Sequence, residues 1–167
     1  MKCPYCKSDL EIYEKIHEIP YFGKIVIFTV RCPNCGFKKS DIEILEEKEP
    51  LRYEFKVENL EDLNTLVIRS STGKISIPEL GIDIEPGPAA EGFITTVEGI
   101  LDRIERIVRT AARWRLEEGN IEAFRKAQDV LKKIYEAKEG KFKFTLIVED
   151  ERGNSAIVSD KAKKTKI

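Results

Sequence analysis

The sequence has little of what catalysis, export and membrane insertion usually require. Its 167 residues include one histidine, one methionine and one tryptophan. No apolar run approaches the roughly 18 residues of a membrane-spanning helix. The N-terminus, MKCPYC, has no apolar signal region. We therefore expect a cytoplasmic protein that does not enter a membrane.

The scarcity of histidine argues against an enzyme. Metal-dependent oxygenases usually need two or more histidines, and a serine–histidine–aspartate triad could draw only on His17. Neither G-x-x-x-x-G-K-[ST] nor G-x-G-x-x-G is present. Carboxylates are plentiful, but they follow amphipathic patterns that place them in solvent. We predict no catalytic residues, and a hydrolase would need a pocket with strongly perturbed carboxylates.

Charge of neither sign is in excess. The net charge is −1, and residues 1–47 carry seven basic and eight acidic side chains. This balance disfavours avid binding of nucleic acid, which requires a basic surface. Charged residues make up 35% of the chain, a composition that favours a thermophilic source.

The four cysteines all lie within the first 35 residues, in the pairs CPYC and CPNC with 25 residues between them. Two C-x-x-C pairs are typical of a closed tetrahedral site, whose metal holds the fold and does not catalyse. Disulfides would need an oxidising compartment, and a redox C-x-x-C would precede a helical pattern, which neither pair does. We predict one structural Zn²⁺ on Cys3, Cys6, Cys32 and Cys35; spacing alone leaves iron as an alternative.

The segment between the cysteine pairs predicts a β-hairpin. Apolar residues over 10–16 and 25–30 indicate two strands, and IPYFG at 19–23 supplies turn residues. Gly36, after the second pair, can adopt the positive φ of a metal-binding turn, whereas Lys7 holds the equivalent position after the first pair. We expect residues 1–47 to form a zinc ribbon. The two aromatic residues of the loop either pack on the next domain or await a partner.

Residues 48–167 predict a second domain, mostly β with an α insertion. Short strands are indicated at 51–57, 66–68, 75–77, 82–84, 142–148 and 155–159. A helical hairpin is expected at about 95–139, opened by a capping box of Thr95 and Glu98, with Asn120 capping its second helix. Asp150–Asn154 predicts a hairpin turn with Gly153 at positive φ, and residues 161–166 predict a frayed basic tail. This order suggests an antiparallel barrel or double-sheet roll.

The first predicted helix carries a row of arginines at spacings of three, three and four residues: Arg103, Arg106, Arg109 and Arg113. Much of this row lies on one face. One interpretation is a solvated face paired with Asp102 and Glu105. The other is a docking surface for an acidic partner or for phosphates.

Taken together, the cysteine pairs and the motifs IPYFG, VIRS, IPEL, TTVEG and GNS resemble the ZPR-type zinc-finger family over Cys3 to about Ser159. The resemblance implies a four-cysteine zinc ribbon followed by a double-stranded β-helix, a jelly-roll-like barrel that carries an antiparallel helical hairpin. Eukaryotic members have two such modules in tandem, whereas this chain has one and looks like the archaeal form. The turn EDERGNS also has Glu151 where the family leads us to expect proline.

The resemblance also implies a function. Eukaryotic relatives bind translation elongation factor one-alpha, a GTPase, and chaperone its folding. We therefore expect this factor as the partner, with a zinc-ribbon nucleic-acid-associated factor in transcription or translation as the alternative. Gly99 weakens the first turn of its helix, which suggests close approach by another backbone, either within the fold or from a client. The expected partner contacts are Ile19, Pro20, Tyr21, Phe22, Gly99, Arg103 and Arg106.

Overall fold

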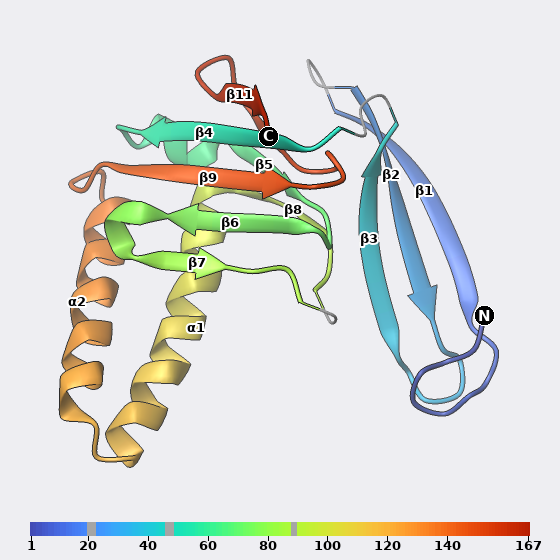
Figure 1. The fold of residues 1–167 in the computed structure, drawn as a ribbon, viewed down its shortest axis with the longest axis horizontal. Helices are drawn as coiled ribbons and strands as arrows, with labels where there is room; N and C mark the ends of the chain where they lie inside the picture. The colour runs from blue at the N-terminus through green and yellow to red at the C-terminus, as the bar shows by residue number, and fades with distance from the viewer. Residues whose placement is uncertain (20–22, 46–48, 88–89) are drawn as a thin grey trace.

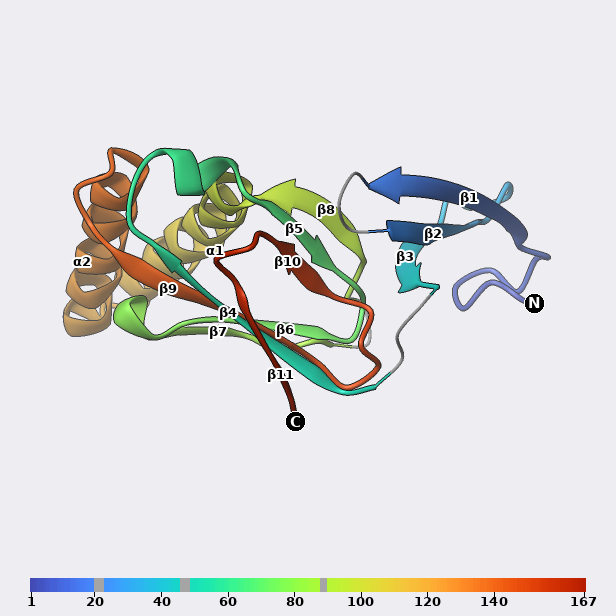
Figure 2. The ribbon, with the colours of Figure 1, turned by 90° about the horizontal axis from the view of Figure 1, so that it is seen from above.

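The computed structural model describes residues 1–19, 23–45, 49–87 and 90–167. A β-roll forms the body of the molecule (Figure 1). A helical hairpin and a three-stranded ribbon project from the same side of this roll, at opposite ends. The view from above shows the same separation of the two projections (Figure 2).

The ribbon is an antiparallel sheet in the order β1-β2-β3, formed by β1 (Glu11–Ile19), β2 (Gly23–Arg31) and β3 (Lys38–Ile44). Its first two strands confirm the predicted hairpin. The third strand was not predicted, because five of its seven residues, KKSDIEI, are polar and its two isoleucines lie at one end. Pro20, Tyr21 and Phe22 lie outside the described residues.

The roll has two antiparallel sheets. The larger has the order β11-β4-β9-β6-β7 and the smaller β10-β5-β8. The strands of the first are β4 (Leu51–Val57), β6 (Gly73–Ile77), β7 (Ile82–Ile84), β9 (Phe144–Asp150) and β11 (Lys163–Lys166). The second contains β5 (Leu66–Arg69), β8 (Phe93–Thr96) and β10 (Ala156–Val158). The 3₁₀ turn η1 (Glu61–Asn64) connects β4 to β5, and η2 (Pro78–Leu80) connects β6 to β7.

The core of the roll contains strands in which buried residues alternate with more exposed ones. In β4 every second residue is buried, from Leu51 to Val57, as expected for a strand with one face against a core. Ile25, Ile42 and Ile44 of the ribbon belong to the same buried cluster as the roll residues. Ribbon and roll therefore share one hydrophobic core.

The structure corrects three local predictions. The turn at 150–154 is not a hairpin, because β9 and β10 belong to different sheets and the chain crosses between them. The basic tail is not frayed: Lys163–Lys166 pairs with Glu54 to Leu51 of β4. The cap of the first helix is Thr96, the last residue of β8, whose hydroxyl accepts a hydrogen bond from Gly99 N at 3.1 Å. The predicted cap, Thr95, lies one residue earlier in the strand.

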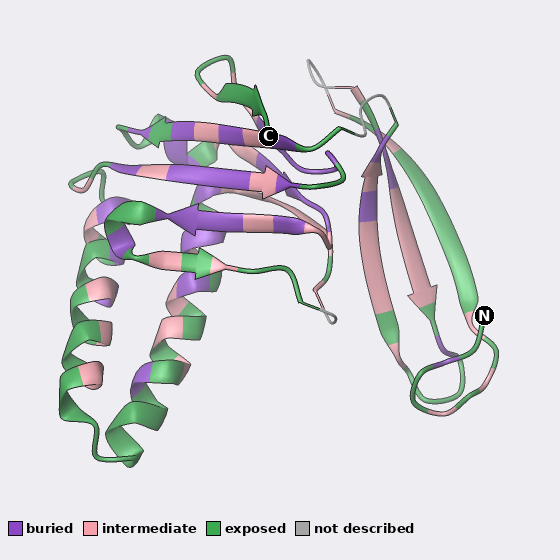
Figure 3. Ribbon diagram, in the orientation of Figure 1, coloured by how far each residue is buried: buried purple, intermediate pink, exposed green. Residues whose placement is uncertain are grey.

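The helical hairpin consists of α1 (Val97–Glu117) and α2 (Ile121–Lys138). Asn120 caps α2 as predicted, with its side chain accepting from Ala123 N at 3.1 Å. The base of the hairpin is buried against the roll, through residues such as Ile100, Ile104 and Ile134. Beyond this base both helices are largely exposed (Figure 3). The hairpin is thus anchored at one end and surrounded by solvent at the other.

Candidate metal centre and partner surface

The four cysteines sit on two knuckles with matching geometry. Cys3 N donates to Ser8 O at 2.8 Å, and Cys32 N donates to Phe37 O at 2.7 Å. The position after each pair has positive φ, 64° at Lys7 and 79° at Gly36. The turn therefore imposes the left-handed conformation even on a lysine, at a steric cost that glycine avoids.

The sulfur atoms converge on one point. All four Sγ atoms lie within 4.8 Å of one another, with Cys3 to Cys35 at 3.5 Å and Cys6 to Cys32 at 3.4 Å. A tetrahedron with Zn–S bonds of about 2.3 Å has sulfurs about 3.8 Å apart. The arrangement therefore fits one tetrahedral metal ion, and four thiolates leave it no open position for a substrate.

The electrostatics of the cage favour a cation. The side chains of Ser8 and Asn34 lower the pKa of the Cys6 thiol to about 5. The Phe37 backbone favours the thiolate of Cys35, but partial desolvation of its sulfur and hydrogen bonds to the other three sulfurs outweigh it and raise the pKa of Cys35 to about 12. Thiols this close cannot all ionise unless a metal ion balances their charge.

The residues predicted to contact a partner are not gathered in one place. Ile19 ends β1, is half-buried and packs against the shared core. Gly99, Arg103 and Arg106 lie on α1, in the other projection. The two groups therefore belong to opposite ends of the roll (Figure 1).

The expectation that another backbone within the fold approaches Gly99 is wrong. The atoms nearest to a Cβ added at Gly99 belong to the Thr95 side chain, not to a second backbone. Because Thr95 is the second-last residue of β8, glycine at position 99 lets the strand lead directly into the helix. Gly99 thus serves a close contact within the fold.

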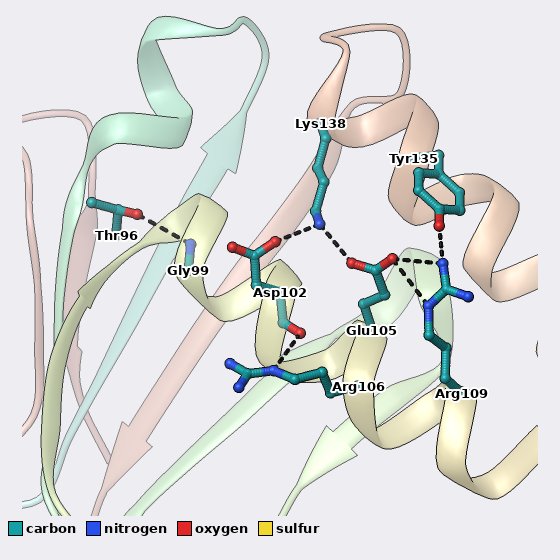
Figure 4. Close-up of polar contacts among 8 residues, drawn as sticks. All are labelled: Thr96, Gly99, Asp102, Glu105, Arg106, Arg109, Tyr135 and Lys138. Carbon is teal, nitrogen blue, oxygen red and sulfur yellow. Dashed lines mark hydrogen bonds and ion pairs between the residues drawn. The ribbon is translucent and has the colours of Figure 1, made fainter.

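The arginine row of α1 divides between two environments. Arg109 turns toward α2, donating to Glu105 at 2.9 Å and contacting the Tyr135 hydroxyl (Figure 4). Lys138 of α2 joins the same group, with its ammonium 2.7 Å from Glu105 and paired with Asp102. This part of the row confirms the interpretation of paired charges and fastens the two helices together.

Arg103 and Arg106 have different surroundings. The Arg103 guanidinium stacks over the Phe93 ring, 3.9 Å from its centroid, and Arg106 donates to the Asp102 carbonyl at 3.4 Å. Both side chains are exposed. Ile107 and Trp114 are also 57% and 61% exposed, and at spacings of four and seven they share a face with Arg103. We call Arg103, Arg106, Ile107 and Trp114 the outer face of α1.

The motifs VIRS and GNS meet in a buried polar junction that sequence reasoning missed. Asp150 is 1% exposed and accepts hydrogen bonds from the hydroxyls of Ser70, Thr72 and Ser155, each at 2.6 Å. Ser155 in turn accepts from Ser70 N at 3.0 Å. The small polar residues of both turns were the sequence signal for this junction, since such residues form hydrogen bonds with backbone and carboxylate groups in tight turns.

The same junction fastens the ribbon to the roll. Asp41 of β3 accepts hydrogen bonds from the backbone and the hydroxyl of Ser71. Asn154 accepts from Ile44 N at 3.1 Å. The strand edge of β3 is therefore completed by turns of the roll, in addition to the apolar contact between the two parts.

In the described part of the chain, no helix is long and apolar enough to cross a membrane.

Comparison with known proteins agrees with this architecture. The chain matches the ZPR1 zinc-finger domain over residues 1–49 and the ZPR1 jelly-roll domain over residues 61–167. A ZPR1-like protein of Pyrococcus horikoshii is 46% identical over an alignment of 167 positions that covers 99% of this chain and 75% of that protein. A ZPR1-like protein of Methanocaldococcus jannaschii is 43% identical over 162 residues, 96% of this chain and 80% of that protein.

Similarity extends to eukaryotes. The zinc finger chaperone zpr1 of Schizosaccharomyces pombe is 33% identical over 151 residues, 89% of this chain but 33% of the chaperone. These names describe zinc fingers and a chaperone, and they state no catalytic activity. The matched zinc-finger domain also identifies zinc as the metal that the four cysteines hold. With both its domains matched in order, the chain belongs to the ZPR1 family.

Proposed function

We propose that this protein binds translation elongation factor one-alpha and acts as a chaperone for its folding. Family membership supports a zinc-binding protein, and one relative bears the name of a zinc finger chaperone. The elongation factor comes from the motif resemblance described above. The structural observation that carries the proposal is the outer face of α1, where apolar and basic side chains are exposed together.

The outer face has the chemistry of a protein-binding surface. Trp114 is 61% exposed on this face, and tryptophan and arginine are enriched among the residues that dominate binding energy. Arg103 is held in place by its stacking on Phe93, so part of the surface is already ordered before binding. Preordered side chains lose less conformational entropy when a partner docks.

The alternative of a nucleic-acid-associated factor has less support. Lys161 is paired with Asp62 at 2.7 Å and Lys166 with Glu49 at 2.8 Å. The basic C-terminal residues are thus partly neutralised within the chain. Phosphate binding would require these pairs to open, and residues 1–47 carry eight acidic and only seven basic side chains.

Binding of the zinc-loaded full chain to elongation factor one-alpha, in its nucleotide-free, GDP and GTP forms, tests the proposal. We expect binding that depends on the nucleotide. Trp114→Ala should weaken binding of the elongation factor at least tenfold, because truncating a tryptophan buried in an interface typically costs about 2 kcal/mol of binding free energy. Leu116→Ala is the matched control, since Leu116 is 51% exposed on another face of the same helix.

Absence of binding to every form, with the chain folded and its zinc retained, would overturn the proposal. Binding of RNA with a steep dependence on salt would then favour a nucleic-acid-associated factor, because release of counterions contributes much of the affinity of protein–nucleic acid complexes. Chaperone activity needs a separate measurement, the yield of active elongation factor refolded with and without this protein. An unchanged yield would mean that the protein binds the elongation factor but does not chaperone its folding.

A further inference from the structure

The outer edge of β1 is a long, regular and exposed strand edge. β1 is an end strand of the ribbon sheet and pairs with β2 without a bulge from Glu11↔Arg31 to Ile19↔Gly23. It is exposed along most of its nine residues (Figure 3). Native proteins usually protect such edges with bulges, prolines, short strands or charged side chains. Of these, β1 has only the charged side chains, which leave its backbone groups open to a partner of opposite charge.

The opposite edge of the sheet shows what a completed edge looks like. Ser40 O of β3 accepts from Gly92 N at 2.9 Å, and Ile44 N donates to Asn154 at 3.1 Å. Ile42 N donates to the Asp41 side chain at 2.8 Å. Each outward backbone group named here has a partner. Within the described residues, the outward backbone groups of β1 have none.

The ladder fixes which residues of β1 face outward. Outward groups on β3 belong to even-numbered residues, so the odd-numbered residues of β3 bond to β2. Backbone groups alternate in direction along an antiparallel strand, and the registers of both ladders carry this alternation across to β1. Ile12, Glu14, Ile16 and Glu18 therefore present free N–H and C=O groups.

The side chains of these four residues lie on one face of the sheet, because they are two positions apart. Ile12 and Ile16 are 53% and 64% exposed, and Glu14 and Glu18 are exposed as well. The edge thus alternates apolar and acidic side chains beside unpaired backbone groups. An incoming strand would meet hydrogen-bond partners and a charge pattern at the same time.

We propose that the outer edge of β1 binds an extended segment of another protein as a fourth strand of the ribbon sheet. Opposite Ile12 and Ile16 the segment carries apolar side chains, and opposite Glu14 and Glu18 it carries lysine or arginine. This site is separate from the outer face of α1 and does not depend on the elongation factor being the partner.

A second copy of this chain fits the edge poorly. Two antiparallel registers place isoleucine opposite isoleucine over most of the strand. One register puts Glu14 opposite Glu14 of the other copy, and the second puts Glu14 opposite Glu18. A parallel pairing in register also places glutamate opposite glutamate. Like charges directly opposite each other destabilise a sheet, so the acidic residues select a basic partner against self-association.

A synthetic peptide tests the proposal directly. The nine-residue peptide KTVTKTVTK has the required pattern and reads the same in both directions, so it covers parallel and antiparallel pairing. We expect it to bind the zinc-loaded full chain and to protect the β1 amides of residues 12, 14, 16 and 18 from hydrogen exchange. The acidic peptide ETVTETVTE should bind at least tenfold more weakly.

Backbone methylation distinguishes strand pairing from simple charge attraction. One peptide is N-methylated at its internal lysine and valine positions and a second at its threonines. In strand pairing one set of amides points at β1 and the other away, so one peptide should lose binding and the other keep it. Loss in the first indicates antiparallel pairing, and loss in the second indicates parallel pairing.

Variants locate the site on the chain. The double substitution Glu14→Lys and Glu18→Lys should weaken binding of KTVTKTVTK about tenfold, since two attractive cross-strand pairs become repulsive. Ile107→Lys is the matched control on the outer face of α1 and should leave peptide binding unchanged. Equal binding of both methylated peptides, unchanged affinity of the double variant, or no binding of KTVTKTVTK at millimolar concentration would overturn the proposal.

Discussion

The side-chain oxygen of Asn154 accepts a hydrogen bond from the backbone N–H of Ile44, across 110 residues of sequence. Asn154 lies in the turn after β9, and Ile44 is the last residue of β3. Both residues are buried. This bond joins the ribbon to the roll at a point where water has little access, which makes it sensitive to substitution.

Removing this acceptor should destabilise the folded chain. Asn154→Ala leaves Ile44 N–H buried without a partner, and we expect a loss of about 1–3 kcal/mol in the free energy of unfolding. Denaturant unfolding of the zinc-loaded protein measures it. Asn64→Ala, at an exposed position, should change stability by less than about 0.5 kcal/mol. Equal effects of the two substitutions would show that the Asn154 bond adds nothing.

Alanine substitutions at Gly153 and Gly119 distinguish the effect of backbone strain from that of a steric clash. Both have positive φ, 69° and 78°, so alanine strains either position by about 1–2 kcal/mol. A Cβ on Gly153 would also strike the Glu49 backbone oxygen, whereas nothing lies within 4 Å of a Cβ on Gly119. Gly153→Ala should therefore lower the melting temperature clearly more than Gly119→Ala. A similar decrease in both variants would mean that the Glu49 segment yields without cost.

The contact between Gly99 and Thr95 predicts a change of sign in a double-mutant cycle. Alone, Gly99→Ala should destabilise the chain, because the new methyl collides with the Thr95 hydroxyl. In a Thr95→Ala background that obstacle is gone, and the higher helix propensity of alanine should stabilise by about 1 kcal/mol. Urea unfolding of the four proteins provides the cycle. Additive effects would contradict the contact.

Zinc removal should unfold the ribbon. We expect one zinc per chain by elemental analysis, and we expect chelation to increase hydrogen exchange in β1, β2 and β3 first, because the metal closes the base of this sheet. Cys35→Ser should lower zinc content and melting temperature together. Chelated protein whose ribbon amides stay protected would refute a structural metal, and a chain purified with iron would refute zinc.

The pairing between helices predicts a pH dependence. The hydrogen bond from Lys138 lowers the pKa of the Glu105 carboxyl; burial opposes the shift, and Arg109 adds to it. Stability from this group is therefore present above its unfolded pKa of about 4.3 and is lost as pH falls through the lower folded value. The parent should exceed Glu105→Gln in stability at pH 7, and the difference should shrink toward pH 3. A constant difference across this range would contradict the pairing. The ribbon is identical in both proteins, so its own titration cancels.

The sequence allowed much of the fold to be predicted, because strong local patterns carried it. The cysteine spacing predicted the ribbon, and the alternation in residues 51–57 and 142–148 predicted β4 and most of β9. Helical periodicity with Asn120 as a cap predicted the hairpin. In each of these cases the local pattern and the tertiary environment favour the same structure.

The failures have a shared physical cause. β3, β8 and β11 are short or polar strands that exist because a neighbouring strand supplies hydrogen bonds, and propensity contains no such information. The junction around Asp150 joins turns that lie 80 residues apart, a distance that no local motif spans. The site was predicted only as far as the metal: the division of the arginine row depended on where α2 lies, and the free edge of β1 depended on which strand ends the sheet.

The bond between Asn154 and Ile44 also has a consequence for biosynthesis. A ribosome makes the ribbon early, but the groups that complete the β3 edge, Gly92 and Asn154, emerge 52 and 110 residues after Ser40 and Ile44 respectively. Until then both edges of the nascent ribbon sheet carry unpaired backbone groups. The newly made ribbon is therefore vulnerable to pairing with other chains during translation, and it gains its protected edge only when the turn after β9 has been synthesised.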